Sequence, residues 1–239
     1  LLIISIFAAG ATGFLVDRKV FNNKQSDEDS DLSLIVCRDK KVRLNGYKFI
    51  KPLLFTESEC ESPEMMGVKA HVQEVVDQLK SNGTVQEASV YLRRLNQGEW
   101  MEINGSEAYL PGSLMKVPEL LTFMKMEEAN PGTLDRKVLF ERPFITGKDV
   151  HYVSKSIEVG KSYTIRELMN YMIVYSDNNA TALLNSVMDI KIFSKVFTDL
   201  GIPAPDLTAK DIPISVNNYS RFMRAIFNAS YLTIENSEY

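Results

Sequence analysis

The stretch "AYLPGSLMKVPELL", residues 108–121, decides how this chain is to be understood. Its leucine, methionine and valine residues recur at helical spacing and predict a buried helix, yet Ser113 and Lys116 lie three residues apart within it. Burial disfavours the charged form of lysine, so the Lys116 amine would tend to lose its proton and could accept one from the Ser113 hydroxyl. The alternative is a capping serine followed by a lysine whose stem is buried and whose ammonium reaches water. By composition alone, S-x-x-K occurs by chance about once in a chain of this length.

A second polar group interrupts the apolar stretch "YMIVYSDNNATALL", residues 171–184. Ser176, Asp177 and Asn178 fall in the break between two helical patterns, where polar side chains can project into a cleft. All three are also good helix caps, so one of them has a structural role in either interpretation. A further S-x-N at residues 215–217 has the pattern of a cap for the last helix.

The patterns on either side of these stretches predict a hairpin followed mostly by helices. Residues 88–104 alternate between apolar and polar and contain the turn Asn96-Gln97-Gly98. Residues 66–79 carry apolar side chains at helical spacing. This order predicts an α+β fold in one domain, residues 34–239, with an antiparallel sheet and a largely helical part.

Three later helices have recognisable starts. Thr164 and Glu167 form a capping-box pattern, and Asp177 precedes another helical stretch. Ser215 is expected to cap the last helix. The apolar residues of that helix fall at spacings of three, four, seven and eight, and they are Tyr219, Phe222, Met223, Ile226 and Phe227.

The N-terminal region differs sharply in composition from the rest. Residues 1–16 are uncharged and apolar, so we expect residues 1–20 to be a signal peptide or membrane anchor, although this apolar run is shorter than the ~20 residues of a full span. A buried core helix is the alternative. Residues 21–33 are polar and acidic and predict a tether. These features favour an extracytoplasmic protein, periplasmic or at the cell surface, that is either secreted or attached to the membrane through its N-terminal segment.

The remaining composition excludes several classes of protein. The net charge of −4 and the absence of a basic run interleaved with aromatic residues argue against nucleic-acid binding. His71 and His151 are the only histidines and have no ligand-rich neighbours, so we expect no metal and no other cofactor. Cys37 and Cys60 are either a disulfide, which export would favour, or two free thiols.

The order of the two polar groups carries a resemblance. S-x-x-K at residues 113–116, followed some sixty residues later by S-D-N between "LMNYMIVY" and "NATALL", resembles the serine β-lactamase and penicillin-binding protein superfamily, with class A β-lactamases most similar. The similarity covers roughly residues 66–185. It implies an antiparallel sheet flanked by helices beside an all-helical lobe, with the active site between them.

The resemblance also implies a role for each polar residue. Ser113 would attack a carbonyl to form an acyl-enzyme, with Lys116 taking part in proton transfer and the Ser113 backbone N–H donating to the oxyanion. Ser176 would relay a proton to the leaving nitrogen. The other implied roles are substrate binding by Asn178 and Tyr175 and support of the loop by Asp177.

The sequence departs from the superfamily pattern in two places. No K-T-G or H-K-x-G motif follows Asn178, and residues 145–147, Ile-Thr-Gly, precede S-D-N and lack the lysine, so we expect a chain truncated at Tyr239. Class A enzymes also use a glutamate in a Glu-x-x-x-Asn loop to activate the deacylating water. No glutamate occurs here between Glu167 and Glu235, so acylation is better supported than rapid deacylation.

Three hypotheses follow for the function. The first is a β-lactamase-like serine hydrolase that forms an acyl-enzyme on Ser113 with a small-molecule β-lactam or a peptidoglycan peptide. The second is a D-alanyl-D-alanine peptidase or low-molecular-weight penicillin-binding protein, in which the β-lactam adduct is long-lived. The third is a non-catalytic cell-wall-binding relative that keeps the fold and the first two motifs.

Overall fold

The structure is a computed structural model that describes residues 37–46, 48, 52–144, 155–209 and 211–239. The predicted anchor, residues 1–20, and tether, residues 21–33, lie outside the described residues, so the division of the chain into these segments stays a prediction. Within the described part, no helix has both the length and the apolar character needed to cross a bilayer.

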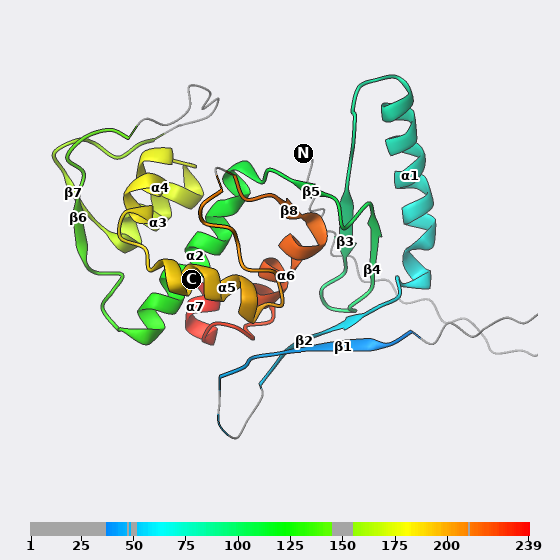
Figure 1. Cartoon of the computed structure of the whole chain (residues 1–239), viewed down its shortest axis with the longest axis horizontal. Helices are drawn as coiled ribbons and strands as arrows, with labels where there is room; N and C mark the ends of the chain where they lie inside the picture. The colour runs from blue at the N-terminus through cyan, green and yellow to red at the C-terminus, as the bar shows by residue number, and fades with distance from the viewer. Residues whose placement is uncertain (1–36, 47, 49–51, 145–154, 210) are drawn as a thin grey trace, which may run out of the picture.

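The helices form most of one lobe, with α2 running through its middle, while α1 lies on the other side of the molecule beside the β3–β4 hairpin (Figure 1). The β1–β2 hairpin extends away from both. The helices are α1 Met66–Ser81, α2 Lys116–Ala129, α3 Ile165–Val174, α4 Asn178–Asn185, α5 Ile190–Asp199, α6 Val216–Phe227 and α7 Ile234–Glu238, with short 3₁₀ helices at Pro63–Met65 (η1) and Gly112–Met115 (η2).

The strands pair antiparallel, which confirms the α+β class. Where a single sheet was expected, the described residues contain four two-stranded pairs, β1–β2, β3–β4, β5–β8 and β6–β7. The predicted hairpin is present in register, with Val90 opposite Ile103 and Arg93 opposite Trp100. The strands are β1 Asp39–Arg43, β2 Leu53–Ser58, β3 Val90–Arg93, β4 Trp100–Ile103, β5 Ala108–Tyr109, β6 Lys137–Leu139, β7 Ser162–Thr164 and β8 Ile214–Ser215.

The three predicted helix starts are confirmed by their hydrogen bonds. The Glu167 backbone N–H donates to Thr164 Oγ1 at 3.1 Å, and the Thr164 backbone N–H donates to Glu167 Oε2 at 2.7 Å, which completes the capping box. Asp177 caps α4, and Ser215 Oγ accepts from the Asn218 backbone N–H at 3.2 Å to cap α6. Side chains of single residues thus fix where these helices begin.

The main core lies around α2 and joins it to α3, α5 and α6. Phe123, Phe197 and Phe222 are fully buried there, and the rings of Phe197 and Phe222 meet edge to face at 5.1 Å. The apolar stripe of α6 is narrower than the sequence predicted, because Met223 is 47% exposed and Phe227 is 51% exposed. These two residues are four positions apart and share a face turned away from the core.

A disulfide closes the base of the β1–β2 hairpin, and ion pairs attach the hairpin to α6. A disulfide joins Cys37 to Cys60, so the disulfide alternative is confirmed over two free thiols. At the other contact, Glu57 of β2 accepts hydrogen bonds from Arg221 and Arg224 of α6 at 2.9 to 3.0 Å. Arg224 is buried, so this ion pair anchors β2 firmly against the helix.

Candidate active site

Ser113 lies in the short 3₁₀ helix η2, which leads directly into α2. The sequence predicted Ser113 and Lys116 within one helix, but α2 begins at Lys116. Gly112 has a φ of 54°, a left-handed conformation that glycine adopts without steric cost, and it turns the chain into η2. Ser113 is therefore exposed at the mouth of the site, whereas Lys116, at 6% exposure, is buried beneath it.

The Lys116 amine contacts the S-D-N segment. Its Nζ donates to Ser176 Oγ at 2.8 Å, to the Ser176 carbonyl at 2.9 Å and to Asn178 Oδ1 at 3.1 Å. Ser113 Oγ lies 3.2 Å from Ser176 Oγ. Among the described residues no direct hydrogen bond joins Lys116 Nζ to Ser113 Oγ, so the expected direct contact is wrong in this geometry. Ser176 stands between the two.

The conformation of Ser176 is unusual. Its φ of 53° places a non-glycine residue in the left-handed region, which carries a steric cost of about 1 kcal/mol. The backbone N–H of Asp177 donates to the Tyr171 carbonyl at 3.1 Å and closes the turn after α3. This turn directs the Ser176 side chain and carbonyl toward Lys116.

Asp177 is only 2% exposed, and its carboxylate makes hydrogen bonds on both sides of the turn. One carboxylate oxygen accepts from the Asn179 backbone N–H at 2.9 Å and caps α4. The other accepts from Ser156 Oγ at 2.9 Å and from the Ile157 backbone N–H at 2.8 Å. Asp177 therefore links the S-D-N turn to the segment that precedes β7, and no pattern in the sequence pointed to these two partners.

Burial controls the charge of the central lysine. Desolvation lowers the pKa of Lys116, opposed in part by the negative charges of Glu119 and Asp177. A lower pKa favours the neutral amine, which can accept a proton.

A buried carboxyl group lies one helical turn after Lys116. Glu119 is 6% exposed, and its Oε1 accepts from Asn185 Nδ2 at 3.3 Å, while its Oε2 is buried with no hydrogen-bond partner among the described residues. Burial raises the pKa of Glu119 to about 7, against the Asn185 hydrogen bond and the Lys116 charge, which lower it. Sequence reasoning missed Glu119. The available signal was its spacing from Lys116 on an otherwise apolar helix face.

Tyr175 lies directly before Ser176, and its ring is packed against two neighbours. The Tyr171 and Tyr175 rings are 5.5 Å apart, and Lys155 Nζ lies 5.4 to 5.5 Å from the centroids of both. This is a cation–π arrangement at the border of the site. Contact of Tyr175 with a substrate stays a prediction.

No carboxylate of the described residues makes a hydrogen bond or ion pair with Ser113 or Lys116. Asp199 accepts from Lys195 and from the Tyr231 hydroxyl, and Asp206 accepts from Thr208 in its own turn. These two aspartates are therefore paired with side chains outside the Ser113 and Lys116 group.

The described residues contain no group of three or more His, Cys, Asp and Glu side chains able to hold a metal ion. The His71 side chain is 80% exposed on α1. His151 and the Ile-Thr-Gly sequence of residues 145–147 lie outside the described residues.

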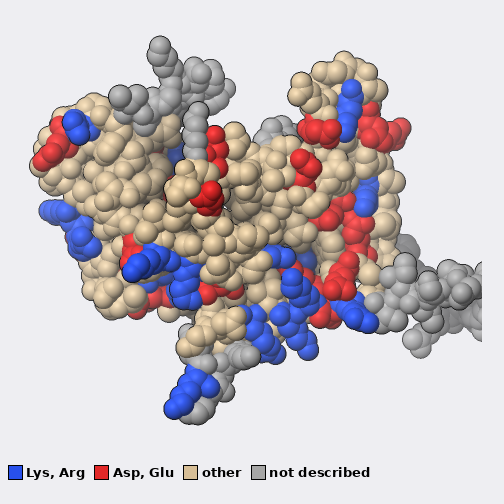
Figure 2. All heavy atoms as spheres, viewed as in Figure 1, with Lys and Arg blue, Asp and Glu red and all other residues tan. Residues whose placement is uncertain are grey.

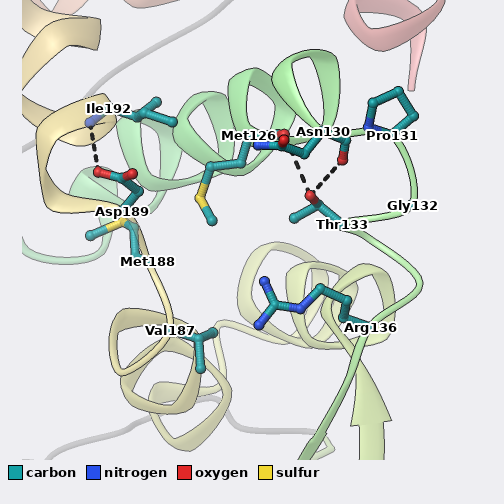
Figure 3. Close-up of a pocket in the computed structure, with 10 residues that line it drawn as sticks. All are labelled: Met126, Asn130, Pro131, Gly132, Thr133, Arg136, Val187, Met188, Asp189 and Ile192. Carbon is teal, nitrogen blue, oxygen red and sulfur yellow. Dashed lines mark hydrogen bonds between the residues drawn. The ribbon is translucent and has the colours of Figure 1, made fainter.

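A cavity of about 520 Å³ lies away from Ser113, between the C-terminal end of α2 and the start of α5 (Figure 3). Two of its polar side chains already bond to the backbone: Thr133 Oγ1 donates to the Asn130 carbonyl at 2.6 Å, and Asp189 caps α5. It contains none of the residues of the S-x-x-K and S-D-N groups. The cavity is therefore separate from the candidate active site.

The β-lactamase enzyme family matches residues 68–239, and the chain belongs to this family. The match includes every residue of the site described above and leaves out the β1–β2 hairpin. No sequence among the curated proteins matches the chain significantly.

Solved structures show the same fold at low sequence identity. A β-lactamase from Sphaerobacter thermophilus is 18% identical, with a TM-score of 0.57, over 70% of this chain and 65% of that protein. A β-lactamase from Chitinophaga pinensis has the same identity and TM-score, with 70% and 67% coverage. An L158E mutant of the protein PBP-A, solved as an acyl-enzyme with penicillin G, is 20% identical with a TM-score of 0.53, and 71% and 66% of the two chains are covered.

Proposed function

We propose that this protein is a serine hydrolase that forms an acyl-enzyme on Ser113 with a β-lactam or a related peptidoglycan amide. The observation that carries the proposal is the continuous contact from Ser113 Oγ through Ser176 Oγ to the buried Lys116 Nζ, at 3.2 and 2.8 Å. An exposed hydroxyl connected to a lysine of lowered pKa is the arrangement that serine activation requires. Family membership supports a hydrolase, and the class A mechanism in particular is part of this proposal.

The reaction begins with the neutral Lys116 amine. Ser113 Oγ attacks the amide carbonyl carbon; its proton passes to Ser176 Oγ, which gives its own proton to Lys116 Nζ. When the C–N bond breaks, the leaving nitrogen takes a proton from Ser176, which is reprotonated by Lys116. The Ser113 backbone N–H, near the start of η2, donates to the developing oxyanion, a contact worth ~3 kcal/mol in such sites.

Asn178 and Tyr175 are the proposed substrate-binding residues. Asn178 Oδ1 accepts from Lys116, which orients its amide NH₂ group toward the site for a substrate carbonyl. Asp177 positions both neighbours through its three hydrogen bonds. No metal or other cofactor takes part in these steps.

A second candidate function is a D-alanyl-D-alanine peptidase with slow turnover of β-lactams. The specific observation in its favour is that no carboxylate of the described residues makes a hydrogen bond or ion pair with Ser113 or Lys116. Water would then attack the acyl-enzyme without a dedicated base, and the adduct would last.

For location, we propose an extracytoplasmic protein that is secreted or held at the membrane by residues 1–20. The Cys37–Cys60 disulfide supports this, because such bonds persist in oxidising compartments.

A labelled penicillin tests the proposed function. The full-length protein should acquire one covalent label on Ser113, identified by peptide mass spectrometry, and Ser113→Ala should acquire none. An adduct lifetime of seconds would support a β-lactamase and one of hours a peptidase. If the folded protein acquires no label on Ser113, the acylation proposal is refuted and the non-catalytic cell-wall-binding interpretation is favoured.

A further inference from the structure

The β1–β2 hairpin carries a concentration of positive charge that the rest of the chain does not share. Residues 38–48 contain five basic residues and one acid, a net charge of +4, while the whole chain has a net charge of −4. The other residues together therefore carry −8. Arg38, Lys40, Lys41, Arg43 and Lys48 are all exposed.

Two of the four acids on or beside the hairpin are paired with basic side chains. Glu57 is paired with Arg221 and Arg224, and Glu61 is paired with Lys69 at 2.6 Å. Asp39 and Glu59 are the exposed acids that remain on the hairpin. In contrast, no ion pair within the described part of the chain involves Arg38, Lys40 or Lys41.

The hairpin is held rigidly enough to present these charges as a surface. The disulfide closes its base, Val42 and Phe55 pack into the main core, and the Glu57 ion pairs attach β2 to α6. Figure 2 shows lysine and arginine along the lower side of the molecule down to the tip of this hairpin, whereas acidic residues gather on the side of α1. The hairpin also lies outside the part of the chain that matches the family, so the shared fold does not account for it.

We propose that the β1–β2 hairpin is a docking surface for an anionic lipid bilayer. The argument for a bilayer over another polyanion is the place of the hairpin in the chain: among the described residues, the hairpin is the element nearest to the predicted anchor, residues 1–20. The 16 residues between the predicted anchor and Cys37 can span at most about 55 Å even when fully extended, which keeps the hairpin near the lipid headgroups. Attraction to an anionic surface acts within a Debye length of about 10 Å.

The hairpin thereby sets the orientation of the body at the membrane. Strand β5, which leads directly into η2 and Ser113, lies in the upper part of the view in Figure 1, while the hairpin projects from the lower side of the molecule. Contact through the hairpin leaves the site facing away from the lipid. The docking proposal is independent of the proposed hydrolase activity.

Lysine-reactive labelling of the full chain on vesicles tests the proposal. One vesicle preparation is phosphatidylcholine alone and the other is mixed with phosphatidylglycerol. We expect labelling of Lys40 and Lys41 to slow by about 5-fold or more on the anionic vesicles and to recover at high salt. The reason is that each basic residue near such a surface increases the affinity for the membrane by a factor of about 5. Labelling of the exposed Lys137 on β6 should be equal on both.

Paired variants provide a second measurement. The ratio of partition coefficients between the anionic and neutral vesicles cancels any insertion of residues 1–20. Lys40→Gln with Lys41→Gln should lower this ratio by about 25-fold, and the matched pair Lys137→Gln with Lys191→Gln should lower it by less than about 3-fold. Equal labelling on both vesicles, or protection of Lys40 and Lys41 by soluble polyphosphate without protection by anionic vesicles, would overturn the proposal.

Discussion

Replacing Glu119 by leucine should make the protein more stable at alkaline pH. Burial raises the pKa of Glu119 from its ordinary 4.5 to about 7, and each pKa unit corresponds to about 1.4 kcal/mol, so ionising this carboxyl in the folded protein costs about 3 kcal/mol. When folding raises the pKa of a group, the group makes its full contribution to the free energy of unfolding below its unfolded pKa. It loses that contribution as the pH rises through the folded pKa. Glu119 therefore destabilises the wild-type protein progressively between about pH 4.5 and pH 7.

Urea denaturation at pH 5 and pH 8 measures this effect. The Glu119→Leu variant should gain about 2 kcal/mol over the wild type at pH 8, since about 1 kcal/mol is lost with the Asn185 hydrogen bond, and little or nothing at pH 5. Glu119→Gln should likewise remove this pH-dependent loss, and Glu141→Gln, at an exposed position, serves as the control. If Glu119→Leu and wild type showed the same difference between pH 5 and pH 8, the burial argument would be refuted.

Three further predictions concern charge and hydrogen bonding. Glu119→Gln removes a negative charge that raises the pKa of Lys116, so the acidic limb of the Ser113 labelling rate should move to lower pH; a shift to higher pH would contradict this. Glu57→Ala leaves the buried Arg224 guanidinium without its carboxylate and should cost about 3 kcal/mol in urea denaturation, and a loss below about 1 kcal/mol would show that the ion pair contributes little. Asp177→Asn should cost about 2 kcal/mol and slow labelling, and unchanged labelling would remove its positioning role.

The residues of the site were predictable because two short motifs occur in a recognisable order. That order identified Ser113, Lys116, Ser176 and Asn178, and the structure places them in one connected group. The path of the hydrogen bonds was not predictable. Spacing along a helix suggested a direct bond from Lys116 to Ser113, but the position of Ser176 depends on the left-handed turn after α3, which follows from packing between elements distant in sequence.

Local signals also predicted the fold better than long-range ones did. Caps and the β3–β4 turn depend on neighbouring residues, and they are found where expected. The pairing of β5 with β8, more than a hundred residues later, had no signal in the sequence. Which apolar residues of α1 face inward was also unpredictable, since only Val76 of its apolar series is fully buried and Val75 is 43% exposed.

The central claim is that a neutral Lys116 amine activates Ser113 through Ser176. A measurement of the pKa of Lys116 tests this claim most directly. The full-length protein with isotopically labelled lysine can be titrated by NMR, with Lys116→Arg used to assign the Lys116 side-chain signal. A pKa below the ordinary lysine value of 10.5 is expected, because desolvation outweighs the charges of Glu119 and Asp177. A Lys116 signal that titrates at or above 10.5 would mean that the amine stays protonated beside Ser176 and cannot activate Ser113.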